Sequence, residues 1–235
     1  MRINKYLSDA GVCSRRKADE HILNGKIKIN GRVAVLGDTA EESDKVTFKE
    51  RPVNLSENKI IYALYKPRGI ISTASDERGR KNVLDLVPKS PRVYPVGRLD
   101  KESEGLMLLT NDGDFAHKLS HPKHGSEKEY QVTFYAKRDI SKDLIVSKLI
   151  KGMLIDGVIM KAKNVEILKS DGNRHIVNLV LTTGHNRQIR KMCDKIGLVI
   201  AKLERIRISN LKINDLKIKP GEYKKISIGE IQYDN

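Results

Sequence analysis

The stretch that decides the fold is PVGRLDKESEGLMLLTNDGD, residues 95–114, where a charged, turn-rich segment runs into an unbroken apolar run. That run, within residues 105–110, is typical of a buried strand. Asp100 stands just before it and has two interpretations. It forms an exposed ion pair with Arg98 or Lys101, which contributes little to stability. Alternatively, it is held at a strand edge beside a deeper arginine that keeps the carboxylate charged and nucleophilic.

A candidate for that arginine lies far downstream, in TTGHNRQIRKMCDKIG, residues 182–197. Arg187 and Arg190 are three residues apart, so one side of a helix can carry both. Asn186 is a suitable helix N-cap, which would direct backbone N–H groups at an anion. The same pattern also fits a basic helix that only contacts phosphates, and composition alone leaves both interpretations open.

The patterns around these two segments predict an α+β domain with a mixed, mainly antiparallel sheet. Tyr130, in the strand pattern KEYQVTF, either packs in the core or stacks on a base. Pro67 ends a strand because it has no N–H for the ladder. Strands are expected at residues 60–66, 105–110, 130–135, 165–168 and 176–182, and helices at 114–119, 141–151 and 186–196.

The first 48 residues predict a separate compact unit. Apolar residues at helical spacing indicate helices within residues 2–24, with a break near Gly11. Ser14 is a suitable N-cap for the second helix. Asn30-Gly31 marks a tight hairpin between alternating strands. The polar residues 49–58 that follow have no pattern and are interpreted as a linker.

The chain of 235 residues is strongly basic, since 45 Lys and Arg against 30 Asp and Glu give a net charge of +15. This favours nucleic acid as partner over a membrane surface, because no basic amphipathic anchor or long apolar segment is present. Few aromatic residues indicate recognition of structured nucleic acid by shape rather than by stacking. Arg15, Arg16 and Lys17 oppose the dipole at the start of their helix, so a phosphate is expected there.

Cys13 and Cys193 are too far apart in the sequence to suggest a zinc framework. The N-terminus lacks the apolar region of a secretory signal. Together these features predict a cytoplasmic protein with reduced thiols. Nothing in the sequence requires more than a monomer.

A metal-dependent nuclease is the competing enzyme class, because His117, His121 and His124 are closely spaced. Pro122 ends the predicted helix, however, and no Cys or Asp nearby completes a ligand set. Solvated loop charges are the better account of the carboxylates that such a scheme would use, which are Asp76, Glu77, Glu127 and Glu129. No phosphate-binding loop, dinucleotide motif, HExxH or serine elbow is present, so no cofactor or metal is expected.

Four motifs, in the order GRLDKESEGLMLLTNDGD, KEYQV, GHNRQIRKM and KLERIRI, resemble the RsuA/RluB/RluF family of ribosomal RNA pseudouridine synthases. The last two are most similar to the RluF-type, large-subunit branch. PGEYKKIS near the end also resembles the small-subunit RsuA branch, so the target subunit stays open. The resemblance implies an S4-like RNA-binding domain over residues 1–48, a linker over 49–58 and a pseudouridine synthase catalytic domain over 59–235.

The resemblance implies cleavage of the C1′–N1 bond of a uridine, rotation of the uracil and rejoining through C5, without cofactor or metal. Asp100 matches the catalytic aspartate, acting as nucleophile at the sugar or as base on its C2′ proton. The target base is expected to leave its stack.

The resemblance also implies the substrate contacts. Tyr130 would stack on the flipped uracil, Arg190 would pair with the catalytic carboxylate, and Leu203 would pack against the base. Arg98 would hold the phosphate of the flipped nucleotide, and Arg187 is expected beside the substrate.

The expected partner is structured ribosomal RNA, either free or in an assembly intermediate. Its expected contacts outside the catalytic centre are Arg2, Lys5, Arg15, Arg16, Lys17, Lys26, Lys28 and Arg32. The alternative function is a non-catalytic RNA-binding or ribosome-assembly protein with the same fold. The presence of Asp100 favours the enzyme.

Overall fold

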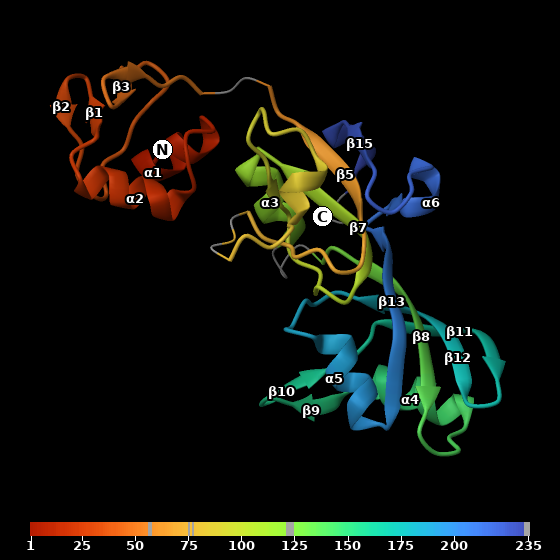
Figure 1. The fold of residues 1–235 in the computed structure, drawn as a ribbon. Helices are drawn as coiled ribbons and strands as arrows, with labels where there is room; N and C mark the ends of the chain where they lie inside the picture. Colours follow the sequence, from red (N-terminus) through yellow and green to blue (C-terminus); the bar gives the residue numbers. More distant parts are fainter. Residues whose placement is uncertain (56–57, 75, 77, 121–124, 233–235) are drawn as a thin grey trace.

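The computed structural model describes residues 1–55, 58–74, 76, 78–120 and 125–232. They form a small N-terminal unit and a larger α+β body (Figure 1). The N-terminal unit packs two helices on a short antiparallel sheet of order β2-β1-β3-β4. Its elements are α1 (Ile3–Asp9), α2 (Arg15–Leu23), β1 (Ile27–Ile29), β2 (Arg32–Val33), β3 (Val46–Phe48) and β4 (Arg51–Pro52).

The local signals in the N-terminal unit are confirmed. The Ser14 side chain accepts a hydrogen bond from the backbone N–H of Lys17 and so caps α2. Asn30 and Gly31 both have positive φ, 50° and 83°, as a tight hairpin between β1 and β2 requires.

The start of the stretch 49–58, interpreted from the sequence as a linker, packs with the N-terminal unit. Lys49 and Glu50 turn the chain with positive φ, and β4 then pairs with β3. Val53 donates a backbone hydrogen bond to Val46 and lies in the core of the N-terminal unit, 8% exposed. A two-residue edge strand that contains a proline gives no periodic pattern, so the sequence showed only polarity here.

One twisted sheet runs through the larger body, with its strands in the order β11-β12-β8-β13-β7-β5-β15. All neighbours on this path are antiparallel except β13 and β7, so the predicted mixed, mainly antiparallel sheet is confirmed. Its strands are β5 (Ile61–Lys66), β7 (Glu104–Thr110), β8 (Lys128–Ala136), β11 (Asn164–Asp171), β12 (Arg174–Leu181), β13 (Leu198–Ile208) and β15 (Tyr223–Ile226), joined by β6 (Tyr94–Pro95) and β14 (Leu211–Lys212).

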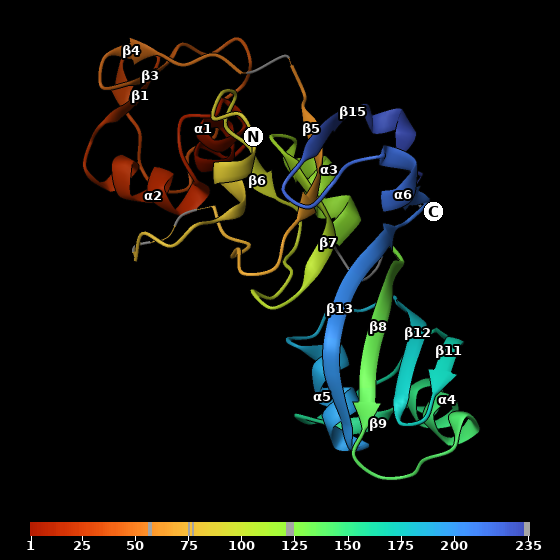
Figure 2. The ribbon, with the colours of Figure 1, turned by 45° about the vertical axis from the view of Figure 1, so that its right-hand side comes forward.

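Helices cover both ends of this sheet (Figures 1 and 2). The helices are η1 (Val83–Leu86), α3 (Gly113–Ser120), α4 (Lys142–Lys151), α5 (Gln188–Lys195), α6 (Ile213–Leu216) and η3 (Ile228–Glu230). A separate hairpin, β9 (Met153–Ile155) with β10 (Val158–Met160), lies beside α5. The expected helices at 114–119, 141–151 and 186–196 are confirmed to within two residues.

Strand β7 is apolar over residues 106–109 because both of its faces are covered there. Leu106 and Leu108 pack in one core cluster with Phe115 of α3, and Met107 and Leu109 pack in another with Val83 of η1. All four β7 side chains have no measurable exposure. Within residues 95–114, strand β7 is therefore a central strand between two cores.

The start of β7 meets the later half of β13 in the sheet's parallel contact, with Glu104 opposite Glu204 and Gly105 opposite Arg205. Gly105 has φ +108°, and a Cβ at this position would lie 2.3 Å from the backbone oxygen of Arg205. Only glycine allows this approach. The contact joins the α4–α5 half of the sheet to the α3 half.

The N-terminal unit lies beside α3, at the end of the molecule remote from α4 and α5 (Figures 1 and 2). Lys5 of α1 forms an ion pair with Asp114 of α3 at 2.8 Å, and a Cβ added at Gly113 would lie 3.4 Å from Asp9 Oδ1. Within the described ranges, no helix is both long and apolar enough to cross a membrane.

We expect Gly105→Ala to lower the free energy of unfolding by about 3 kcal/mol or more, because it adds a steric clash with backbone to an unfavourable φ. Urea denaturation followed by circular dichroism measures the change. Gly229→Ala is the control, since its φ is not positive and no atom lies within 4 Å of the added Cβ. Equal stability of the two variants would contradict the assigned constraint.

Candidate active site

Asp100 lies in the loop between β6 and β7, and this loop is anchored on both sides of it. The side chain of Leu99 is buried, and the Ser72 hydroxyl both donates to the Leu99 carbonyl at 2.7 Å and accepts from the Leu99 N–H at 3.1 Å. The Ser103 N–H donates to the Asp100 carbonyl at 3.0 Å. The Asp100 carboxylate itself remains 29% exposed, so the loop holds it at an open surface.

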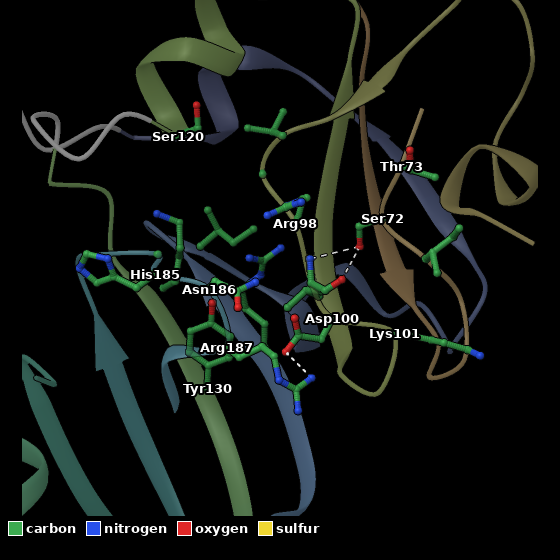
Figure 3. Close-up of a pocket in the computed structure, with 18 of the residues that line it drawn as sticks. Ser72, Thr73, Arg98, Asp100, Lys101, Ser120, Tyr130, His185, Asn186 and Arg187 are labelled. Atoms are coloured by element: carbon green, nitrogen blue, oxygen red, sulfur yellow. Dashed lines mark hydrogen bonds and ion pairs between the residues drawn. The ribbon is translucent and has the colours of Figure 1, made fainter. Parts of the chain in front are cut away.

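The deeper arginine that the sequence analysis expected is Arg190. Its Nε lies 3.5 Å from Asp100 Oδ2, while its Nη2 donates to the Glu102 carbonyl and the Ser103 hydroxyl, each at 3.0 Å. Arg187 is more exposed, with Nη1 3.9 Å from the same Oδ2 (Figure 3). One planar guanidinium therefore faces the carboxylate and also fixes the backbone of the loop that carries it.

A second cation, Lys66, supports the same loop. Lys66, at the end of β5, is fully buried and donates from Nζ to the carbonyls of Ser103 at 2.7 Å and Pro67 at 3.0 Å. Burial lowers the pKa of Lys66 to about 8, although the Asp100 carboxylate acts in the opposite direction. Its carbonyl contacts make Lys66 a support of the loop rather than a surface charge. The sequence analysis did not single it out.

Tyr130 and Leu203 extend the site across the sheet. Tyr130 is opposite Arg205 on the β8–β13 ladder, and Leu203 lies two residues earlier on β13. Both residues line a small cavity of about 90 Å³ together with Asp100 and Arg190. Tyr130 and Asp100 also line a larger adjoining cavity of about 580 Å³. Leu203 is buried, so the small cavity has an apolar side.

The loop before α5 differs from the expectation at one residue. The N-cap of α5 is Arg187, with φ 52°, and not Asn186, which is exposed on the larger cavity. Gln188 closes the loop instead. Its buried side chain accepts hydrogen bonds from the His185 N–H and the Thr183 hydroxyl. The expected side-chain cap failed because the first residue of the helix bonds back to the loop.

Of the other expected substrate contacts, Arg98 is exposed and lines both cavities. The structure thus gathers Asp100, Arg98, Tyr130, Arg187, Arg190 and Leu203 around one pair of adjoining cavities. The residues that sequence reasoning missed are Lys66, Ser72, Ser103 and Gln188, which hold the two loops. None of the four stands out in the sequence, where Lys66 is an ordinary lysine at the end of a strand pattern.

The carboxylates of the nuclease scheme have structural partners. Asp76 pairs with Arg80 at 2.6 Å, and Glu127 and Glu129 both pair with Arg207. His117 lies in the last turn of α3, whereas His121, His124 and Glu77 lie outside the described residues. In the part of the chain that the structure describes, no group of three His, Cys, Asp or Glu is arranged to hold a metal ion.

The expected RNA contacts of the N-terminal unit divide into two groups. Lys5, Lys28 and Arg32 each pair with a carboxylate at 2.8 Å. The others are exposed and form no ion pair within the described ranges: Arg2, Arg15, Arg16, Lys17 and Lys26. Three of these exposed cations stand in sequence at the start of α2. The second group is therefore the part available to phosphates.

This site combines a positioned carboxylate, two guanidinium groups and an aromatic side chain beside an apolar wall. Such a set can hold a planar ring against Tyr130 and Leu203 while a carboxylate acts on an attached group. The loops are fixed by hydrogen bonds before any ligand binds, which is the arrangement that electrostatic catalysis needs.

Comparison with known proteins gives a consistent result. Residues 60–195 match the family model of RNA pseudouridylate synthase, and residues 1–46 match that of the S4 domain. The dual-specificity RNA pseudouridine synthase RluF of Escherichia coli (strain K12) is 36% identical over 233 residues, covering 98% of this chain and 77% of that protein.

A second relative, the ribosomal large subunit pseudouridine synthase B of Bacillus subtilis (strain 168), is 38% identical, covering 96% of this chain and 95% of its own. A crystal structure of a pseudouridylate synthase shares the fold, with a TM-score of 0.66 at 24% identity and coverage of 98% and 97%. The resemblance seen in the four sequence motifs is thereby confirmed. The catalytic-domain model spans more than half of the sequence, and the chain belongs to the RNA pseudouridylate synthase family.

Proposed function

We propose that this RNA pseudouridine synthase acts on a uridine of structured ribosomal RNA, as a monomer in the cytoplasm, with Asp100 as its catalytic residue. The observation that carries the assignment of Asp100 is its pairing with Arg190 at 3.5 Å, in a loop that Lys66 and Ser72 also hold. The names of the E. coli and B. subtilis relatives and the net charge of +15 support an RNA substrate from the ribosome.

In the proposed reaction the uridine is extruded, so that its uracil enters the cavity between Tyr130 and Leu203. The C1′–N1 bond breaks and the electron pair leaves with the uracil. Asp100 assists either by adding to C1′ or by taking the C2′ proton. The uracil turns and C5 bonds to C1′. In the first route this displaces the Asp100 carboxylate from C1′, and in the second Asp100 returns its proton to C2′. The C5 proton is then lost, and N1 gains one.

The guanidinium of Arg190 keeps the Asp100 carboxylate in place during these steps. Its Nε faces the carboxylate, while its Nη2 donates to Glu102 and Ser103. Lysine carries the same charge but cannot make both sets of contacts at once. The exposed cations of α2 add affinity by neutralising phosphates, and they contribute no chemistry.

Replacement of Asp100 tests its proposed catalytic role. We expect Asp100→Asn to abolish one pseudouridine of ribosomal RNA, because the amide neither adds to C1′ nor accepts the C2′ proton. Single-nucleotide pseudouridine mapping of cells with the wild type, without the protein, with Asp100→Asn and with the exposed control Asp171→Asn measures it. The modification should be absent from the second and third strains only. An identical map in all four strains would instead favour a non-catalytic RNA-binding role.

The second prediction concerns Arg190. We expect Arg190→Lys to lower the single-turnover rate by about 100-fold or more with little change in RNA affinity, because the carboxylate loses its fixed partner. Lys195→Gln at the exposed end of α5 is the charge-changing control. A rate within a few-fold of the wild type for Arg190→Lys would show that the charge alone is sufficient.

The third prediction concerns α2. Replacement of Arg15, Arg16 and Lys17 by Ala should weaken RNA binding and lower the slope of log affinity against log salt by about 2–3, since each phosphate contact contributes about 0.7–0.9. Filter binding from low to physiological salt measures the slope. The control replaces three exposed lysines of α4, Lys142, Lys148 and Lys151, by Ala. Equal slopes for the two triple variants would remove α2 from the RNA interface.

A further inference from the structure

The larger cavity extends well beyond the side chains to which the reaction assigns a role. Its volume of about 580 Å³ compares with about 90 Å³ for the cavity between Asp100, Arg190 and Leu203. Tyr130 lines both cavities. From Tyr130 the larger one continues past Lys128 and Arg205 toward Leu119 and Ser120 of α3. In Figure 3 Ser120 and Tyr130 border the hollow from opposite sides.

Two cations occupy one side of this extension. Lys128 lies two residues before Tyr130 on β8, so its side chain is on the same face of the sheet. Arg205 is the direct cross-strand neighbour of Tyr130 on β13. Both residues line the larger cavity and neither lines the smaller one. The cationic pair therefore lies beside the aromatic side chain, away from Leu203.

Neither cation has a carboxylate partner among the residues that the structure describes. Lys128 Nζ donates to the Ser126 carbonyl at 3.1 Å, and Arg205 Nε donates to the Leu106 carbonyl at 2.7 Å. Arg205 is only 2% exposed, and its Nη2 is buried without a hydrogen-bond partner. A buried, unpartnered charged group is unfavourable, so the pair is suited to an anion that arrives with a ligand.

The environment of Lys128 agrees with an anion-binding role. Burial lowers the pKa of its ammonium group to about 8, and Arg205 adds to the lowering. By contrast Glu127 and Glu129, whose side chains alternate with that of Lys128 along β8, are neutralised by Arg207 and Lys163 on the other face of the sheet. The positive charge is thus compensated on that face and uncompensated in the cavity.

We propose that Lys128, with Arg205 behind it, binds a phosphodiester group of the substrate RNA beside the flipped uridine. This site rests on the proposed function, because it deepens the description of the same substrate. A phosphate fits the observations better than a second base, since a base would leave both charges uncompensated. Held there, the strand next to the target has a fixed position relative to Asp100, and Lys128 serves as a positioning residue.

The test is phosphate-ethylation interference on unmodified transcripts of ribosomal RNA. The proteins compared are the wild type and the variants Lys128→Gln, Lys128→Arg and Asp100→Asn, with Lys169→Gln as a control that removes an exposed charge of β11. We expect one phosphate within a few nucleotides of the modified uridine to interfere with every protein except Lys128→Gln. Lys128→Gln should also bind the RNA about tenfold more weakly, and Lys128→Arg should restore binding.

An interference pattern of Lys128→Gln identical to that of Lys169→Gln would overturn the proposal. A loss of isomerisation rate in Lys128→Gln with an unchanged pattern would also overturn it, because it would assign the cation to the uracil rather than to a phosphate. The proposed function fails separately, if the wild type makes no pseudouridine. Ethylation interference depends on RNA binding alone. It therefore still tests the phosphate site if the wild type makes no pseudouridine.

Discussion

The close approach of β7 to β13 at Gly105 is the constraint on which the rest of the structure depends. The two strands come from parts of the chain about a hundred residues apart, and they touch over only two residue pairs. That register puts the loop before β7 over the middle of β13. Asp100 belongs to the α3 half of the sheet, whereas Leu203 and Arg190 belong to the α4–α5 half. The contact brings all three to one cavity.

The loop that carries Asp100 is held mainly through its main chain. Lys66 and Arg190 bind carbonyls of residues 102 and 103, and Ser72 binds both polar groups of Leu99. Main-chain contacts of this kind leave the carboxylate free of competing donors except the two arginines. They also explain how a short, polar loop keeps one geometry without a covalent link or a metal. A displacement of about 1 Å at such a carboxylate lowers the catalytic rate severely, so rigid support by Lys66 and Arg190 favours the proposed reaction.

Much of this arrangement could be predicted from the sequence, because its signals are local. The apolar run of β7, the cap at Ser14 and the Asn30-Gly31 hairpin each depend on neighbouring residues, and each prediction is confirmed. The features that were missed depend on distant partners. Strand β4 is too short to show a period, and the role of Gln188 appears only when its side chain meets His185 and Thr183. Lys66 reads as an ordinary strand-end lysine until two carbonyls surround it.

The sheet continues without interruption from β11 to β15, through the same contact at Gly105. The loop with Asp100 and the strand with Leu203 therefore belong to one sheet. A uridine in a mismatch, bulge or loop leaves its stack at a lower free-energy cost than one inside a regular helix. In the proposed reaction, a uridine of the first kind would therefore reach Asp100 more readily than one inside a regular helix.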